Sequence, residues 1–288
     1  MSEGKQSRSR LVFLLSPPAL TLLVFFFVPL VIMASYTVRE GTFGVASRTF
    51  SLDSFRTLTE NPGFLRLLKD SMVLSLQTSF FAILLAYPVA YFLVFHAGKR
   101  RMSLLTLLIV PAWTSYLLRI LAWKLILGSN GVLNYTLLNL GWIDEGVPIF
   151  LYSRTAVLIT LVYVWVPFAA LPIFSSLERI QRHLLEAASD LGAKPWESFL
   201  RVTLPLSFPG ILAAFFFVSI PTVGEWVTPT LVGGVDGIMY GNLIQDQFSR
   251  ALNWPMGALL SMVLLVIVLV AVMVFNRFVN ITEVGAYG

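Results

Sequence analysis

The sequence contains no cysteine, which excludes disulfide bonds and metal sites built on thiolates. Its only histidines are His96 and His183, neither has a second ligand at metal-binding spacing, and no H-E-x-x-H motif occurs. We therefore expect no metal and no cofactor. The same absences lead us to reject an intramembrane enzyme.

Charged residues are also scarce. They make up 12% of the 288 residues, whereas a soluble domain typically carries about a quarter. With 57% hydrophobic residues and a mean hydropathy of +0.81, the chain is expected to lie in a membrane. The net charge of +5 does not indicate nucleic acid, because the basic residues form short clusters beside apolar runs, as the flanks of membrane helices do.

Six apolar runs are long enough to cross a bilayer as helices. The sequence thus predicts an all-α integral membrane protein, one transmembrane domain over residues 1–288, with spans at about 11–36, 67–96, 103–127, 155–174, 208–231 and 256–278. The first run exceeds the 7–15 apolar residues typical of a signal peptide, so we interpret it as a retained span. Residues 37–66 carry mixed charge, glycine and proline, which predicts an extramembrane loop.

Six spans place both termini on one side of the membrane. On that side we count eleven lysines and arginines, against seven on the other side. Since basic residues are enriched in cytoplasmic loops, the count predicts cytoplasmic termini and a cytoplasmic connection between the fourth and fifth spans.

That connection, residues 176–207, is the longest polar interruption in the second half of the chain. Apolar residues recur at helical spacing from Leu184 to Leu191, and Gly192 then suits a helix end. Pro195 suits the first turn of a second short helix, whose apolar stripe is Trp196, Phe199, Leu200 and Leu204. Two surface helices that merely pack on their own protein are the alternative interpretation.

The residues Glu186-Ala187-Ala188, then Gly192, then Val202-Thr203-Leu204-Pro205 resemble the EAA loop of bacterial ABC importer permeases. That pattern reads E-A-A, three residues, G, nine residues, I, one residue, L-P, and only the isoleucine differs, being Val202 here. Residues 110–119, 131–134 and the run 231–255 look like the spermidine/putrescine permease subfamily. Permeases for thiamine, ferric ion or a phosphonate remain the alternatives for the solute.

The resemblance implies a pore subunit in the bacterial cytoplasmic (inner) membrane. It would form a heterodimer with a second, homologous permease, bind two copies of a cytoplasmic ABC ATPase, and receive solute from an extracytoplasmic binding protein. The chain lacks the G-x-x-x-x-G-K-[ST] loop that cradles ATP phosphates, so it is not expected to be an enzyme itself. A stand-alone secondary transporter is the competing class, although no inverted repeat is recognisable.

By the same resemblance, Glu186 meets a basic group on the ATPase, Ala187 and Ala188 permit close approach, and Gly192 makes the turn. Trp196, Phe199 and Leu200 are expected to pack against the protein's own spans.

For a polycation we expect carboxylates and aromatic faces along the path. Glu225 is the one acidic residue well inside a predicted span, and it either contacts substrate or forms an ion pair with Arg119, which lies at a similar predicted depth. The candidate aromatic residues are Trp113, Tyr116 and Trp226, with lipid-facing or core positions as the alternative.

Overall fold

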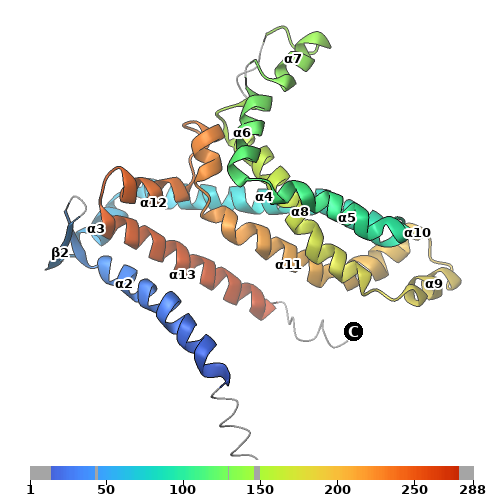
Figure 1. The fold of residues 1–288 in the computed structure, drawn as a ribbon, viewed down its shortest axis with the longest axis horizontal. Helices are drawn as coiled ribbons and strands as arrows, with labels where there is room; N and C mark the ends of the chain where they lie inside the picture. The colour runs from blue at the N-terminus through green and yellow to red at the C-terminus, as the bar shows by residue number, and fades with distance from the viewer. Residues whose placement is uncertain (1–13, 43–44, 129, 146–149, 279–288) are drawn as a thin grey trace, which may run out of the picture. The chain divides into compact units, whose positions relative to one another are not determined.

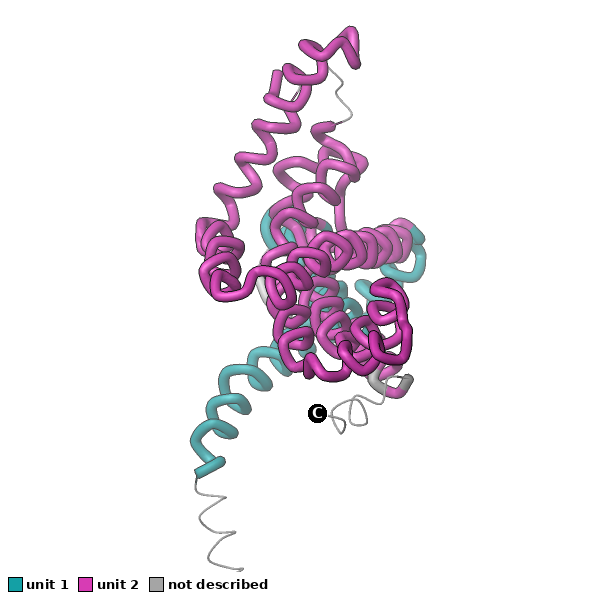
Figure 2. Tube along the Cα trace, turned by 90° about the vertical axis from the view of Figure 1, so that its right-hand side faces the viewer, with its two compact units in different colours: residues 1–62, 243–267 teal, residues 63–242, 268–288 magenta. Residues whose placement is uncertain are grey.

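The computed structural model describes residues 14–42, 45–128, 130–145 and 150–278. It divides into two compact units, residues 1–62 with 243–267 as unit 1 and residues 63–242 with 268–288 as unit 2 (Figure 2). The expectation of one transmembrane domain stays a prediction. The basic residues Lys5, Arg8 and Arg10 lie outside the described residues.

Within the described residues, six helices are long and apolar enough to cross a membrane, which confirms the predicted architecture. They are Leu14–Tyr36, Pro62–Phe95, Tyr116–Asn139, Arg154–Glu178, Pro195–Val223 and Trp254–Phe275. The bounds differ from the predicted ones mainly in the third and fifth spans.

Unit 1 holds the first span and the first half of the last helix. The first span includes η1 (Leu23–Phe27) and α2 (Val28–Tyr36), and the last helix is α13 (Trp254–Phe278). The predicted extramembrane loop is more ordered than expected: β1 (Arg39–Thr42) pairs antiparallel with β2 (Val45–Phe50), and α3 (Asp53–Glu60) follows. The pairing aligns Arg39 with Phe50 and is irregular before Gly41.

The core of unit 2 is built where α4 (Pro62–Phe95), α8 (Arg154–Glu178) and α11 (Leu204–Val223) meet. Ala82, Ala86 and Ala90 recur every four residues on α4 and are fully buried, because small residues let membrane helices approach closely. The most extensive packing between two of these helices is that of α8 on α11, which lie side by side in Figure 1. At Gly210 a methyl group would stand only 2.4 Å from Ser176 Cβ, so this crossing requires glycine.

Hydrogen bonds tie α4 to α11 across this core. Ser75 Oγ donates to Ser219 O at 2.7 Å, and the hydroxyls of Tyr87 and Ser207 are 2.9 Å apart. Bonds between membrane helices add directional attraction where the hydrophobic effect between them is weak.

The third span is not the single helix predicted over 103–127. Here η2 (Gly98–Arg100), α5 (Arg101–Ile109) and η3 (Val110–Trp113) lead to an extended Thr114, after which α6 (Tyr116–Leu127) and α7 (Val132–Asn139) follow. Pro111 has no N–H to continue the helix, so it favours the break. Arg101 at the start of α5 forms an ion pair with Glu178 of α8 at 2.9 Å.

The fifth span begins earlier and ends earlier than the predicted 208–231. It runs without interruption through α10 (Pro195–Ser198), the π-helical η5 (Phe199–Thr203) and α11. The helix ends at Gly224 and Glu225, and a short helical stretch that includes η6 (Pro229–Gly233) follows. The separate helix α12 (Tyr240–Ser249) comes after it.

Candidate functional site: the α9 elbow and the Glu225 cluster

The elbow begins with α9 (Arg182–Asp190), which lies past the end of α8 in unit 2 (Figure 1). The first predicted helix is therefore present, and no residue of α9 is buried. Glu186 and Ala187 are exposed, and Glu186 forms no ion pair or side-chain hydrogen bond with any described residue. The three EAA residues thus lie on a helix that is available to a partner.

Gly192 ends α9 in the left-handed conformation, with φ +82°. The N–H of Ala193 donates to Ala188 O at 3.0 Å and that of Gly192 to Ser189 O at 2.9 Å, which is the paired bonding of a Schellman helix end. A Cβ here would meet no atom within 4 Å. Backbone conformation, and not space, is therefore what this position requires of glycine.

The second predicted elbow helix does not exist as a separate element, because α10 and η5 continue into α11. Of the three supporting aromatic and aliphatic residues, Phe199 packs as predicted, with ring centroids 5.8 Å from Tyr87 and from Tyr91. The prediction was wrong for Trp196 and Leu200, which are 59% and 48% exposed.

The Glu225 carboxylate caps the helical stretch that follows the break. Its Oε1 accepts the backbone N–H groups of Trp226, Val227 and Thr228 at 3.1, 2.7 and 3.1 Å. Its Oε2 accepts the Tyr116 hydroxyl at 2.7 Å, and that hydroxyl also lies 2.8 Å from Thr228 Oγ1. Both carboxylate oxygens are therefore used within the chain, and they stabilise the N-terminal N–H groups of a helix.

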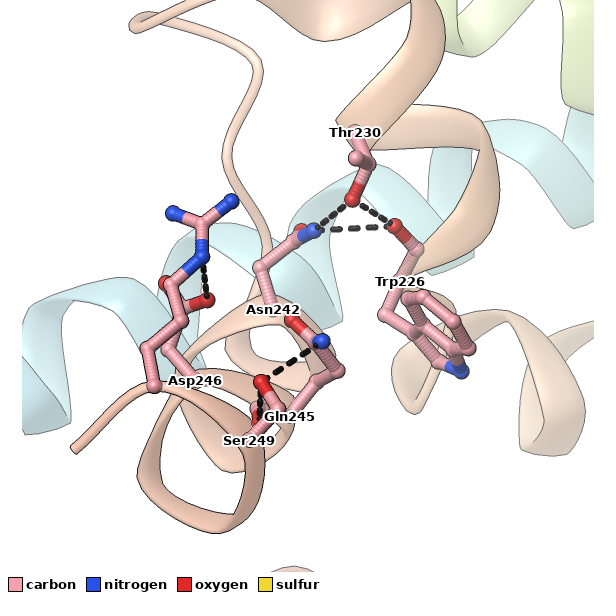
Figure 3. Close-up of polar contacts among 7 residues, drawn as sticks. Trp226, Thr230, Asn242, Gln245, Asp246 and Ser249 are labelled. Atoms are coloured by element: carbon pink, nitrogen blue, oxygen red, sulfur yellow. Dashed lines mark hydrogen bonds and ion pairs between the residues drawn. The ribbon is translucent and has the colours of Figure 1, made fainter. Parts of the chain in front are cut away.

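Asn242 holds the same stretch from the other side. Its Nδ2 donates to Trp226 O at 2.8 Å and to Thr230 Oγ1 at 2.7 Å (Figure 3), and its Oδ1 accepts the N–H of Met239 at 3.0 Å. The α12 backbone is tied to α4 by the N–H of Tyr240, which donates to Ser71 Oγ at 2.7 Å. Burial raises the pKa of the Tyr240 phenol to about 12, so this group stays neutral at physiological pH.

The predicted ion pair between Arg119 and Glu225 is absent, since no charged atoms of the two lie within 4.0 Å. Tyr116 contacts both instead: its hydroxyl binds Glu225, and the Arg119 guanidinium lies 5.9 Å from its ring centroid. The equal depths inferred from residue counts assumed unbroken helices. The breaks at Thr114 and Glu225 invalidate that count.

The two other candidate path residues differ in their surroundings. Trp226 is 43% exposed beside the capped carboxylate, whereas Trp113 on η3 is 80% exposed and makes no ring contact with a described residue. Thr228 and Asn242, which complete the cluster, were not predicted from the sequence. A threonine three residues after a break-forming Gly-Glu pair was the available signal for a helix start, and nothing marked Asn242.

Comparison with known proteins identifies the family. The model of the binding-protein-dependent transport system inner membrane component family matches residues 7–281. The chain belongs to this family. It is thus an inner-membrane, multi-pass permease component of a transport system.

Two curated relatives and one solved structure illustrate the similarity. The permease is 37% identical to the spermidine/putrescine transport system permease protein PotB of Escherichia coli over 258 residues, or 89% of this chain and 93% of that protein. Its identity to PotB of Haemophilus influenzae is 34%, covering 89% of each chain. A chain of a bacterial alginate ABC transporter, solved with a periplasmic protein bound to alginate pentasaccharide, has a TM-score of 0.74 at 19% identity, covering 95% of each chain, and supports the fold alone.

Replacing the capping carboxylate should destabilise the permease in proportion to the acceptors lost. Glu225→Ala removes the acceptor of three backbone N–H groups and of the Tyr116 hydroxyl, so we expect the free energy of unfolding to fall by about 1–3 kcal/mol. Glu225→Gln retains an oxygen acceptor and should lose less. Thermal unfolding of the detergent-purified variants measures the difference.

The control is Arg119→Gln, which should change stability by the same amount in the wild type and in the Glu225→Gln variant. A change that differs between the two backgrounds would indicate an ion pair and contradict the cap.

Proposed function

We propose that this chain is a permease subunit of an ATP-driven ABC importer that carries spermidine and putrescine into the cytoplasm. The family membership supports the transport role, and the 37% identity to PotB over most of both chains supports the solute class. Thiamine, ferric ion and phosphonates are the alternative solutes, and a stand-alone secondary transporter is the alternative class.

The proposal divides the work among subunits. A second, homologous permease completes the pore as a heterodimer, two copies of a cytoplasmic ATPase hydrolyse ATP, and an extracytoplasmic binding protein delivers the solute. This chain has no Walker A loop, which supports placing hydrolysis on a separate subunit. The excess of basic residues on one side supports cytoplasmic termini and a cytoplasmic α9.

In this proposal α9 is the coupling helix that docks on the ATPase. Glu186 offers an exposed carboxylate without a partner in its own chain, Ala187 and Ala188 add no bulk, and Gly192 returns the chain toward the membrane. Exposed apolar side chains flank these residues, with Leu191 89% and Trp196 59% exposed. An exposed apolar and acidic helix end of this kind suits a partner surface better than water.

The continuous helix Pro195–Val223 supports a direct mechanical link from the elbow to the Glu225 cluster. Its 29 residues correspond to roughly 43 Å, about the full thickness of a bilayer. A movement of α9 at one end would therefore be carried as a rigid shift to the break at Glu225, and small rigid shifts of helices are a common way to switch packed interfaces.

For the substrate path we propose Glu225 and Trp226, with Tyr116 as their support. An ammonium group can approach the exposed part of the Trp226 indole beside a carboxylate, and cation–π attraction favours that position without requiring Glu225 to release its backbone bonds. Arg119 is removed from the proposed path because a guanidinium repels a polycation. Trp113 stays a prediction of the sequence.

Transport by the reconstituted complex tests the proposal. Proteoliposomes that contain both permeases, the ATPase and the binding protein should accumulate radiolabelled spermidine or putrescine only when ATP is present on the side of the membrane that carries the ATPase. Unlabelled thiamine, ferric ion and aminoethylphosphonate serve as competitors. Uptake by this chain alone, or competition by one of those solutes and not by polyamines, would contradict the proposal.

A charge reversal on α9 should uncouple the permease from the ATPase while leaving the permease in the membrane. Glu186→Lys places a cation against the proposed basic group of the ATPase, and we expect solute-stimulated hydrolysis to fall by about tenfold or more, as for a lost charge pair at an interface. Glu145→Lys, an exposed acidic residue between α7 and α8, is the matched control. Equal hydrolysis in the two variants would remove α9 from the coupling role.

A further inference from the structure

Arg119 is an unsatisfied cation within unit 2. It is only 9% exposed, yet its Nε is fully buried without a hydrogen-bond partner, and its side chain forms no ion pair with any described residue. Among the described residues, its guanidinium makes one cation–π contact, with the Tyr116 ring at 5.9 Å. A guanidinium carries five N–H donors, and a buried arginine in a membrane segment is normally paired with an acid or with carbonyl groups.

The side chain lines a groove of about 730 Å³ formed by α4, α5, η3, α6 and α8. Apart from Arg119, the groove is lined by apolar and aromatic residues together with proline, among them Phe81, Leu107, Trp123, Val162 and Tyr163. It therefore combines a long apolar surface with one buried positive charge. An apolar helix that carries a single carboxylate is complementary to both features.

A lipid phosphate is the competing source of negative charge. The groove reaches from Phe81, 19 residues from the start of α4, to Leu158, which lies four residues, or about 6 Å, from the start of α8. A crosslink to lipid alone in the experiment below would identify that source.

A second copy of this chain offers no unpaired acid in the spans that the structure describes. Among the described residues, four acidic residues lie within or directly after a candidate span, and each is already bonded in its own chain. These are Asp70 with Arg154, Glu178 with Arg101, Glu197 with the N–H of Lys194, and Glu225 with its cap.

We infer that the Arg119 groove receives a transmembrane helix of a second, non-identical membrane subunit, and that an Asp or Glu of this helix pairs with Arg119. The inference rests on the proposed function, because that function supplies a second permease. It adds which surface of this chain meets that subunit and why the two permeases differ in sequence.

Two adjacent phenylalanines of α4 line different grooves, so they give a matched pair of probe positions. Phe81 lines the Arg119 groove and is 41% exposed, whereas Phe80 is 61% exposed and lines a separate groove of about 600 Å³ that has no charged residue. In the complete transporter, each is replaced in turn by the photo-crosslinker benzoylphenylalanine, and mass spectrometry locates the adduct.

We expect the Phe81 probe to form an adduct with the second permease, on a helix with an Asp or Glu within one turn, and the Phe80 probe to form far less of it. Arg119→Met should reduce that adduct by at least about tenfold relative to Arg119→Lys, which keeps the charge. The wild-type adduct decides the matter even if Arg119→Met fails to reach the membrane.

An adduct with lipid only, with another copy of this chain, or on a helix without a nearby acid would overturn the inference, as would equal adducts in the two Arg119 variants. Polyamine uptake by the complex without the crosslinker is measured separately. A failure of uptake with a correct adduct would count against the proposed solute and leave the groove assignment intact.

Discussion

Backbone N–H groups in the first turn of a helix have no acceptor within that helix, and the arrangement around Glu225 follows from this constraint. The carboxylate accepts three of these N–H groups, and Tyr116 occupies its remaining oxygen. Asn242 also donates a hydrogen bond to the Trp226 carbonyl, so side-chain hydrogen bonds hold the chain on both sides of the break. The charge of Glu225 therefore has a structural role within the chain.

Close packing of α4, α8 and α11 makes that junction mechanically relevant. Alanines on α4 and Gly210 on α11 bring the backbones together, and hydroxyl bonds from Ser75 and Tyr87 fix their register. The helix that emerges from this core as α10 leads directly to the α9 turn. A partner that moves α9 therefore acts on the same rigid element that ends at Glu225.

Much of this organisation could be predicted from residue patterns. The six spans follow from apolar runs, and α9 with its glycine turn follows from the spacing of Glu186 and Gly192, because length, hydropathy and left-handed backbone are local properties. The fusion of α10 with α11 and the break after Val223 could not be predicted from the sequence. Prolines such as Pro205 and Pro221 occur at helix starts, at kinks and within membrane helices alike. The Arg119 and Glu225 pairing failed for the same reason, because side-chain partners depend on where helices break.

The most direct test of the account is whether the helix between the elbow and Glu225 moves as one body. The natural chain has no cysteine, so spin labels can be placed at Trp196 and Ile220 alone, which are 59% and 41% exposed and about 36 Å apart along the helix. Electron–electron distance measurements on the complete transporter, without nucleotide and with ATP trapped, should give the same distance within about 2 Å if helical geometry is kept. A change of several ångström, or a second distance population, would show a hinge within the helix and contradict a rigid connection.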